Sequence, residues 1–329
     1  MPHSTTQTID DSKSHADWRD DLFRDGYVVV KGLLAQERCD KYIQDMFSWL
    51  EKFPYGFDRN KKETWTEEHL PTHMKGGMYH GYSVQHERFM WEARQEPKVI
   101  EAFSKLWDTD KLLVSFDGMN LTLPSPNTRT ASEPWPHVDQ SPLRVGLQCV
   151  QGILNFAPNG PRDGGLIVMK GSHAFTQEFF KTHAGVQGRE TWGSADWFGF
   201  EPSEVKWFED RGCELTKVCA EPGDLILWDS RTVHYNVLPE TQNLRALIYL
   251  CYTPVSFATP EDLAAKTKYF DEFRGTTHWP HANIFPVGEK KLRLGQTDIG
   301  DRDRPFDEPE QTATVLELAG RTALEQIAA

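Results

Sequence analysis

The stretch Trp135-Pro136-His137-Val138-Asp139-Gln140 places an imidazole and a carboxylate two positions apart. Side chains at positions i and i+2 of an extended strand leave the same face, so His137 and Asp139 can approach one metal ion together. A third ligand is needed, and the best candidate is His234, at the end of the apolar run 224–234. We therefore expect the fold to bring the distant His234 close to this stretch.

Two imidazoles and one carboxylate on one side of an ion form the ligand set of non-haem Fe(II) sites, which leaves the other coordination positions open. We therefore predict His137, Asp139 and His234 as metal ligands and as the catalytic centre. Arg245 follows His234 by eleven residues and opens a second apolar run, 246–250. A guanidinium at that place can hold a carboxylate through two parallel hydrogen bonds.

This order of His-x-Asp, distal His and Arg resembles the phytanoyl-CoA dioxygenase family of Fe(II)/2-oxoglutarate oxygenases. Residues 164–173, GGLIVMKGSH, are similar to the family segment G-x-L-x-V-x-P-G-S-H, with Lys170 in place of the usual proline. Residues 222–224, PGD, resemble the turn before the strand that carries the distal histidine. Residues 27–34, YVVVKGLL, resemble the family's first strand. The motifs following that strand cover roughly residues 112–254, and the C-terminal part resembles some fungal members.

The resemblance implies a mainly β protein with flanking helices, folded as a double-stranded β-helix (jelly roll, cupin-like). We expect residues 1–15, which are rich in Ser, Thr, Gln and Asp, to be a disordered N-terminal tail. Residues 16–329 should form a single catalytic domain, because a chain of 329 residues lies within the range of one elaborated barrel-type domain. Its core should span about 112–254, with helical support before it and an insertion and a helix after it.

Hydrophobic periodicity, together with the residues that interrupt it, predicts the helices and strands. The expected helices are 16–24, 35–53, 87–107 with an interruption at Pro97, 174–181, 262–274 and 313–327. The expected strands are 27–30, 112–123, 145–156, 166–169, 223–234 and 245–253.

The resemblance also implies the cofactors Fe(II), 2-oxoglutarate as co-substrate, and O2, with the far carboxylate of 2-oxoglutarate at Arg245. Gln151 is a further candidate contact, because an inward glutamine is costly unless it is hydrogen-bonded. Gln148 lies three residues before Gln151, so on an extended strand its side chain should point to the opposite face. Met119, eighteen residues before His137, stands where the family places a side chain against 2-oxoglutarate. A buried core methionine is an equally open interpretation.

Four further residues are candidates for lining the substrate site. Tyr79 and His80 lie in a region from which the family takes such contacts. The alternative is that Tyr79 is an aromatic residue of a surface loop and that His80 is a solvated imidazole. His278 and Trp279 lie in the C-terminal insertion, which could overhang the pocket. His278 and His281 as a second metal pair is disfavoured, because the first three ligands already complete a site. The loops 185–200, rich in Trp and Phe, and 275–307 could act as lids or only pack down.

Composition limits the partners. The net charge is −13, from 36 Lys and Arg against 49 Asp and Glu, which gives no attraction to nucleic acid or to anionic membranes. No run approaches the roughly 20 apolar residues that cross a bilayer. Five scattered cysteines fit reduced thiols, so we expect a cytoplasmic protein that binds a small molecule. Monomer and homodimer both remain open.

The sequence thus predicts an enzyme, an Fe(II)- and 2-oxoglutarate-dependent dioxygenase. It would oxidise a C–H bond of a small molecule by hydroxylation, desaturation or ring formation. Analogy with biosynthetic fungal members suggests a secondary metabolite or an amino acid derivative as substrate. Two alternatives are a jelly-roll binding protein without oxygenase activity and a zinc hydrolase that uses the same three ligands. Asp139 disfavours halogenation, because related halogenases carry a small residue there.

Overall fold

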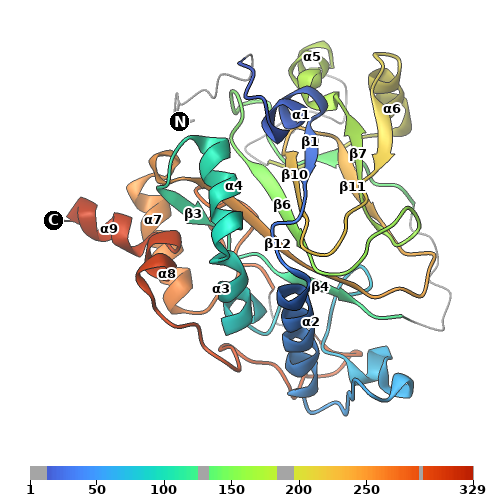
Figure 1. Cartoon of the computed structure of the whole chain (residues 1–329), viewed down its shortest axis with the longest axis vertical. Helices are drawn as coiled ribbons and strands as arrows, with labels where there is room; N and C mark the ends of the chain where they lie inside the picture. The colour runs from blue at the N-terminus through green and yellow to red at the C-terminus, as the bar shows by residue number, and fades with distance from the viewer. Residues whose placement is uncertain (1–12, 125–132, 184–195, 289–291, 329) are drawn as a thin grey trace.

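The structure is a computed structural model that describes residues 13–124, 133–183, 196–288 and 292–328. Helices surround a central arrangement of β-strands (Figure 1). The α-helices are α1 (Trp18–Asp25), α2 (Gln36–Glu51), α3 (Arg88–Arg94), α4 (Pro97–Trp107), α5 (Thr176–Thr182), α6 (Pro202–Glu209), α7 (Pro260–Asp271), α8 (Ala313–Leu318) and α9 (Arg321–Ala328). Short 3-10 helices are η1 (Lys62–Thr64), η2 (Glu67–His69), η3 (Val84–His86), η4 (Ser172–Ala174) and η5 (Val255–Phe257).

The larger of the two described sheets has antiparallel strands in the order β1-β10-β6-β12-β4-β2, with β3 also paired to β12. Its strands are β1 (Tyr27–Val30), β2 (Met78–Tyr79), β3 (Leu112–Val114), β4 (Met119–Thr122), β6 (Val150–Asn155), β10 (Leu225–Asp229) and β12 (Arg245–Pro254). The smaller sheet has the order β8-β5-β11-β7-β9. Its strands are β5 (His137–Val138), β7 (Gly165–Lys170), β8 (Phe198–Gly199), β9 (Glu214–Lys217) and β11 (His234–Val237).

The two sheets face each other across a hydrophobic cluster. Ile153 and Leu247 of the larger sheet share this cluster with Leu166 and Val168 of the smaller one. Two facing antiparallel sheets of non-sequential strand order are the architecture of a jelly roll. The predicted fold class is therefore confirmed, although the described strands form two sheets and do not close into a barrel.

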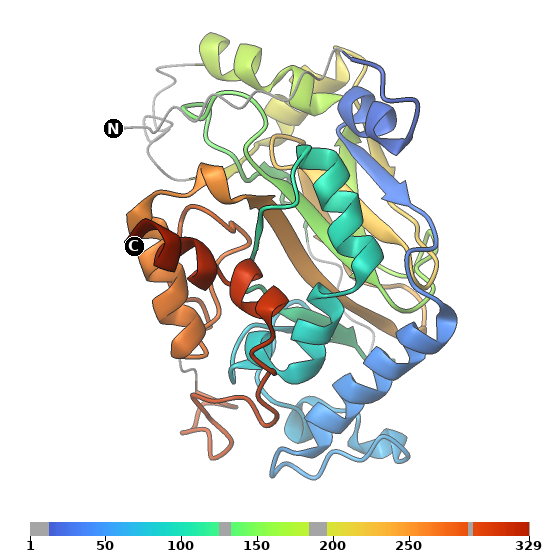
Figure 2. The same cartoon turned by 60° about the vertical axis from the view of Figure 1, so that its left-hand side comes forward.

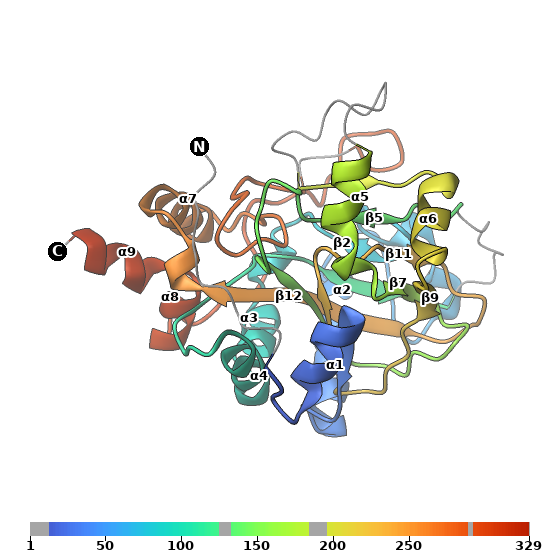
Figure 3. The same cartoon turned by 90° about the horizontal axis from the view of Figure 1, so that it is seen from above.

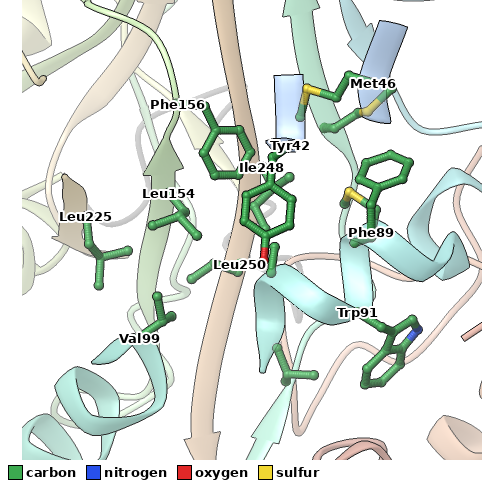
Figure 4. Close-up of a cluster of buried hydrophobic side chains, with 14 of the residues drawn as sticks. Tyr42, Met46, Phe89, Trp91, Val99, Leu154, Phe156, Leu225, Ile248 and Leu250 are labelled. Carbon is green, nitrogen blue, oxygen red and sulfur yellow. The ribbon is translucent and has the colours of Figure 1, made fainter. Parts of the chain in front are cut away.

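Helices α2, α3 and α4 cover the outer face of the larger sheet (Figure 4). Because successive side chains of a strand point to opposite faces, Ile248 and Leu250 of β12 pack under these helices while Leu247 and Tyr249 face the smaller sheet. Tyr42 of α2 stacks on Phe156 with ring centroids 5.0 Å apart. The alternation of β12 gives the larger sheet an outer helical face and an inner face.

The C-terminal helices gather close to one another (Figure 2), at the end of the molecule opposite α6 and β9 (Figure 3). The predicted helix 313–327 is two helices, because Gly320 between them has φ +84°. Val315 and Leu318 of α8 belong to the same buried cluster as Leu22 of α1. No helix within the described ranges combines the length and apolar character that crossing a membrane requires.

Two predicted strands are each divided. The prediction 112–123 is wrong at residues 115–118, where Gly118 approaches Tyr79 so closely that a Cβ atom would lie 2.1 Å from the Tyr79 carbonyl oxygen. The prediction 223–234 combines the whole of β10 with the first residue of β11, and these two strands lie in different sheets. His234 therefore opens a strand of the smaller sheet, and this places it opposite His137.

Candidate metal centre

His137 and His234 are direct cross-strand partners in the antiparallel pair β5 and β11. Their ring centroids lie 4.3 Å apart. Asp139 follows β5, and its backbone N–H donates to the carbonyl of Ser230 at 2.9 Å. All three side chains are buried, and one ligand atom from each lies within 4.8 Å of the others. The structure thus brings together the three residues that the sequence selects.

Backbone carbonyls determine which nitrogen of each imidazole faces this site. Nδ1 of His137 lies 3.1 Å from the carbonyl oxygen of Trp135, and Nδ1 of His234 lies 2.9 Å from that of Thr232. A carbonyl oxygen only accepts, so each Nδ1 carries the proton and each Nε2 presents a lone pair. The Nε2 atoms of His137 and His234 lie 3.7 and 3.2 Å from Oδ2 of Asp139. A divalent ion fits this donor set.

The surroundings favour the protonation states that bind metal. Burial alone would raise the pKa of Asp139, but the close contacts of its carboxylate with the imidazoles of His137 and His234 outweigh it and hold that pKa well below its usual range. Burial lowers the pKa of His137, and His234 adds to the effect. An ionised carboxylate beside a neutral imidazole is the state that coordinates a cation.

Gln151 of β6 contacts the metal centre through Asp139. Its Nε2 donates to Oδ2 of Asp139 at 2.9 Å and lies 3.4 Å from Oγ of Ser230. The amide thus orients the carboxylate, a role that the sequence prediction of a 2-oxoglutarate contact did not include. Gln148 donates instead to the carbonyl of Val145 at 2.9 Å.

Arg245, the first residue of β12, lies on the inner face of the larger sheet. It pairs with Thr122 and shares its face with Leu247 and with Gln151 on the neighbouring strand. Its side chain is buried against the backbone of Gly165, and its Nε has no hydrogen-bond partner among the described residues. A buried guanidinium N–H without an acceptor is costly, so a carboxylate at this place would satisfy it.

Met119 and Tyr79 face away from this site, so the structure does not bring these two candidate residues to the metal centre. Met119 pairs with Ile248, and both pack in the cluster under the helices. Tyr79 pairs with Met119, and its ring makes an edge contact with Trp49 of α2 at 5.2 Å. Partners in an antiparallel pair point to the same side, and here that side is the helical one.

The inner positions of β4 belong to Asn120 and Thr122, which sequence reasoning missed. They pair with Leu247 and Arg245, whose side chains face inward. Thr122 Oγ1 donates to Asn120 Oδ1 at 2.9 Å. Side chains of β4 alternate between its two faces, so knowing which face one residue occupies would have identified Asn120 and Thr122.

His80 lies beside a cavity of about 250 Å³, which Met74, Met78 and Val287 also line. Its Nε2 is 3.4 Å from Oδ1 of Asp117, and its ring centroid is 6.4 Å from that of Tyr249 on the inner face. His80 therefore lies next to a space that a small molecule could enter.

Trp279 anchors its segment to the body of the protein. It is 1% exposed, packs against Cys149 and Cys251, and lies under the guanidinium of Arg144 at 4.5 Å. His278 is close enough to Asp139 to help lower the pKa of that carboxyl.

The loop before α6 is only partly described, and the residues at 184–195, including Trp192, lie outside the described ranges. Phe198 and Phe200 pack against Phe179, which favours the interpretation of a loop that packs down. Trp197 is 58% exposed, with its ring centroid 6.0 Å from that of His137.

Lys75 also approaches the centre and was not predicted. Its Nζ lies 3.6 Å above the ring of Trp135, and that ring stacks on His137 at 4.4 Å. Burial of the amine lowers the pKa of Lys75, while Asp139 acts in the opposite direction. Its segment has no hydrophobic period, so no sequence signal pointed to it.

Comparison with known proteins agrees with this geometry. The family model described as phytanoyl-CoA dioxygenase matches residues 22–236. The chain belongs to the phytanoyl-CoA dioxygenase family. It is 45% identical to the Ava biosynthesis cluster protein O of Aspergillus versicolor over 269 residues, covering 81% of this chain and 87% of the relative.

Two solved structures share the fold. The product of GlcNAc-inducible gene 2 of Candida albicans has a TM-score of 0.57 at 14% identity, covering 98% of this chain and 82% of that one. A hypothetical protein of Escherichia coli has a TM-score of 0.56 at 15% identity, covering 92% and 80%.

As a member of the phytanoyl-CoA dioxygenase family, the chain is an Fe(II)- and 2-oxoglutarate-dependent oxygenase. The matched segment contains His137, Asp139 and His234 but ends before Arg245 and His278. The alternatives of a pure binding protein and of a zinc hydrolase receive no support from this relationship.

Proposed function

We propose that His137, Asp139 and His234 hold Fe(II), that Arg245 holds the far carboxylate of 2-oxoglutarate, and that the enzyme oxidises a C–H bond of a small biosynthetic molecule. The observation that carries the proposal is the buried convergence of three ligand atoms within 4.8 Å. Two neutral imidazoles and one carboxylate leave positions for further molecules, which a closed four-ligand site would not.

The chain's own groups bind and orient. The carbonyls of Trp135 and Thr232 fix the two rings, and Gln151 fixes the carboxylate of Asp139. Arg245 supplies a charge-assisted contact to a dicarboxylate. When bound, Fe(II) with 2-oxoglutarate and O2 supplies the oxidising chemistry that breaks a substrate C–H bond.

The substrate class rests on the relative from a biosynthesis cluster, at 45% identity. We assign this enzyme to the oxidation of a secondary metabolite or an amino acid derivative, by hydroxylation, desaturation or ring formation. The net charge of −13 supports a small molecule over a nucleic acid or an anionic membrane. We place the enzyme in the cytoplasm, as a monomer or homodimer.

The test measures succinate formed from 2-oxoglutarate by purified protein supplied with Fe(II) and O2. Asp139→Ala removes one ligand and should abolish turnover. The control is Asp210→Ala, which removes an exposed carboxylate paired with Lys206 and should keep wild-type turnover. If Asp139→Ala kept full turnover, the ligand assignment would be wrong.

A further inference from the structure

The cavity of about 250 Å³ beside β2 combines apolar and acidic walls. Its apolar wall is formed by Met74, Met78 and Val287. The carboxylates of Asp298 and Asp301 also line it. An apolar lining with a few polar groups is typical of the sites that bind small molecules. A cavity of roughly 150 Å³ already admits benzene, so this one can take a two-ring aromatic molecule.

A single hairpin carries both the apolar wall and a contact to the metal centre. The backbone N–H of Met74 donates to the carbonyl of Met78 at 2.9 Å, and Lys75 lies in the turn between them. Lys75 Nζ lies 3.6 Å above the ring of Trp135, which stacks on His137 with ring centroids 4.4 Å apart. The two ends of the hairpin therefore line the cavity, while its turn lies one aromatic ring away from a metal ligand.

Met78 also contacts the interior between the two sheets. It packs against the cluster of the two inner faces that contains Trp228 and Tyr249. The ring centroid of Trp228 lies 5.5 Å from that of His234. Two separate series of contacts thus lead from the cavity wall to the two imidazole ligands, which indicates that the cavity belongs to the same active site.

Asp298 gives the cavity a negative charge that neutral groups hold in place. Its carboxylate accepts from the hydroxyl of Tyr82 at 2.5 Å, from the hydroxyl of Tyr55, and from the backbone N–H of Gly300 at 2.9 Å. Burial, together with the hydrogen bond to Asp298, raises the pKa of Tyr82 to about 12, so this phenol keeps its proton at neutral pH. The carboxylate is therefore fixed by its neighbours without being neutralised by them.

Arg293 approaches this group of residues but does not pair with Asp298. Its guanidinium lies over the Tyr55 ring at 3.7 Å, and its Nε donates to the carbonyl of Leu70 at 3.0 Å. Within the described ranges, no lysine or arginine forms an ion pair with Asp298. An unpaired carboxylate in the wall of a cavity attracts cations into it.

We propose that this cavity binds the substrate that the enzyme oxidises, and that this substrate carries a basic nitrogen, which lies at Asp298, on an apolar body, which lies against Met74 and Met78. The inference rests on the proposed function, because it makes the cavity part of that active site. Methionine side chains are flexible and polarizable and contact aromatic rings favourably, so an aromatic body fits this wall best.

The experiment compares three probes that share an indole ring and differ in the charge of the tail. Tryptamine is a cation at neutral pH, tryptophol is neutral, and indole-3-acetate is an anion. Calorimetric titration of the full chain should show tryptamine binding about tenfold more tightly than tryptophol, the effect of one charge-assisted hydrogen bond. Indole-3-acetate should bind most weakly.

Two variants locate the binding. Asp298→Asn keeps the shape of the side chain and removes its charge, so tryptamine and tryptophol should then bind within about twofold of each other. Asp210→Asn, at an exposed carboxylate paired with Lys206, should keep the tryptamine preference. Met78→Trp should fill the cavity and weaken all three probes by about tenfold or more. Leu215→Trp, at an exposed position of β9, should match wild type.

Mn(II) tests whether the cavity lies at the metal centre, because this paramagnetic ion broadens the proton NMR signals of molecules bound near it. Mn(II) added to wild type should broaden the signals of bound tryptamine. His234→Ala, which lacks one proposed ligand, should lose this broadening while tryptamine still binds. The unfolding midpoint in urea confirms that each variant is folded.

Three results would overturn the proposal. Tryptamine that does not bind, or that binds no more tightly than tryptophol, would exclude a basic substrate, as would a preference that persists in Asp298→Asn. Unchanged tryptamine affinity in Met78→Trp would place the binding outside the cavity. Tryptamine that binds without broadening by bound Mn(II) would separate the cavity from the metal centre. The proposed function fails separately if wild type binds no Mn(II), a result that does not affect the calorimetric comparison of the probes.

Discussion

Single carbonyl and amide groups define the chemistry of the metal centre. The carbonyls of Trp135 and Thr232 each hold one imidazole Nδ1, so the Nε2 lone pairs of His137 and His234 face Asp139. Such outer partners fix the tautomer and orientation of a ligand, and their loss weakens metal binding.

Gln151 provides the matching support for Asp139, and this leads to a prediction. Gln151→Ala removes the 2.9 Å hydrogen bond to the carboxylate and should weaken Fe(II) affinity by about 10- to 100-fold. Gln148→Ala is the control, because this second glutamine, three residues earlier, donates to the carbonyl of Val145. Anaerobic metal titration distinguishes the two, and equal affinities would refute the orienting role of Gln151.

Arg245 should act on the co-substrate alone. Arg245→Ala removes a charge-assisted contact and should raise the 2-oxoglutarate concentration for half-maximal turnover by about 10- to 100-fold. Its Fe(II) requirement should change little, because the guanidinium holds no metal ligand. Arg88→Ala, which removes a surface arginine paired with Asp307 and Glu310, controls for the loss of charge. An unchanged 2-oxoglutarate requirement would contradict the assignment.

At the scale of elements, a buried histidine joins η3, α3 and the segment that follows α7. His86 accepts from Trp91 Nε1 at 3.3 Å through Nδ1, and its Nε2 lies 3.0 Å from the carbonyl of Arg274. A neutral ring with its proton on Nε2 satisfies both contacts. Burial first, and then the charge of Arg94, lower the pKa of His86 to about 3.

This histidine should make folding stability depend on pH. Between pH 6.5 and about 3 the unfolded chain binds a proton at His86 and the folded chain does not, so stability falls as the pH falls through this window. From pH 7 to 5.5 the free energy of unfolding of the wild type should fall by about 1 kcal/mol more than that of His86→Gln. Urea unfolding at the two pH values measures this, and equal losses would contradict it.

Sequence reasoning predicts those features that a local pattern within one strand determines. The spacing of His137 and Asp139, and the apolar run before His234, predict the ligand cluster, because these are local patterns. The direction of the Met119 side chain could not be predicted, because the phase of its strand depends on the interruption at 115–118 and on pairing with Ile248. Neither the close approach of Gly118 to Tyr79 nor the position of Lys75 above Trp135 is a local pattern. Both depend on contacts between segments distant in sequence.

Across the whole molecule, the site lies between the two sheets. The smaller sheet contributes the strands that carry His137 and His234, while the larger sheet contributes Gln151 and Arg245. The proposed metal and co-substrate positions thus belong to different layers of the jelly roll, and the facing of the layers brings them together. The outer helices support this arrangement without supplying a predicted ligand (Figure 4).

The most direct test of this account is an anaerobic titration of the purified protein with Fe(II) and then 2-oxoglutarate. The weak visible absorption of an iron-chelated 2-oxo acid is the measured quantity. The account predicts that this band appears in the wild type and is lost in His234→Ala. Iron binding without the band in the wild type, or an undiminished band in His234→Ala, would contradict the proposed centre.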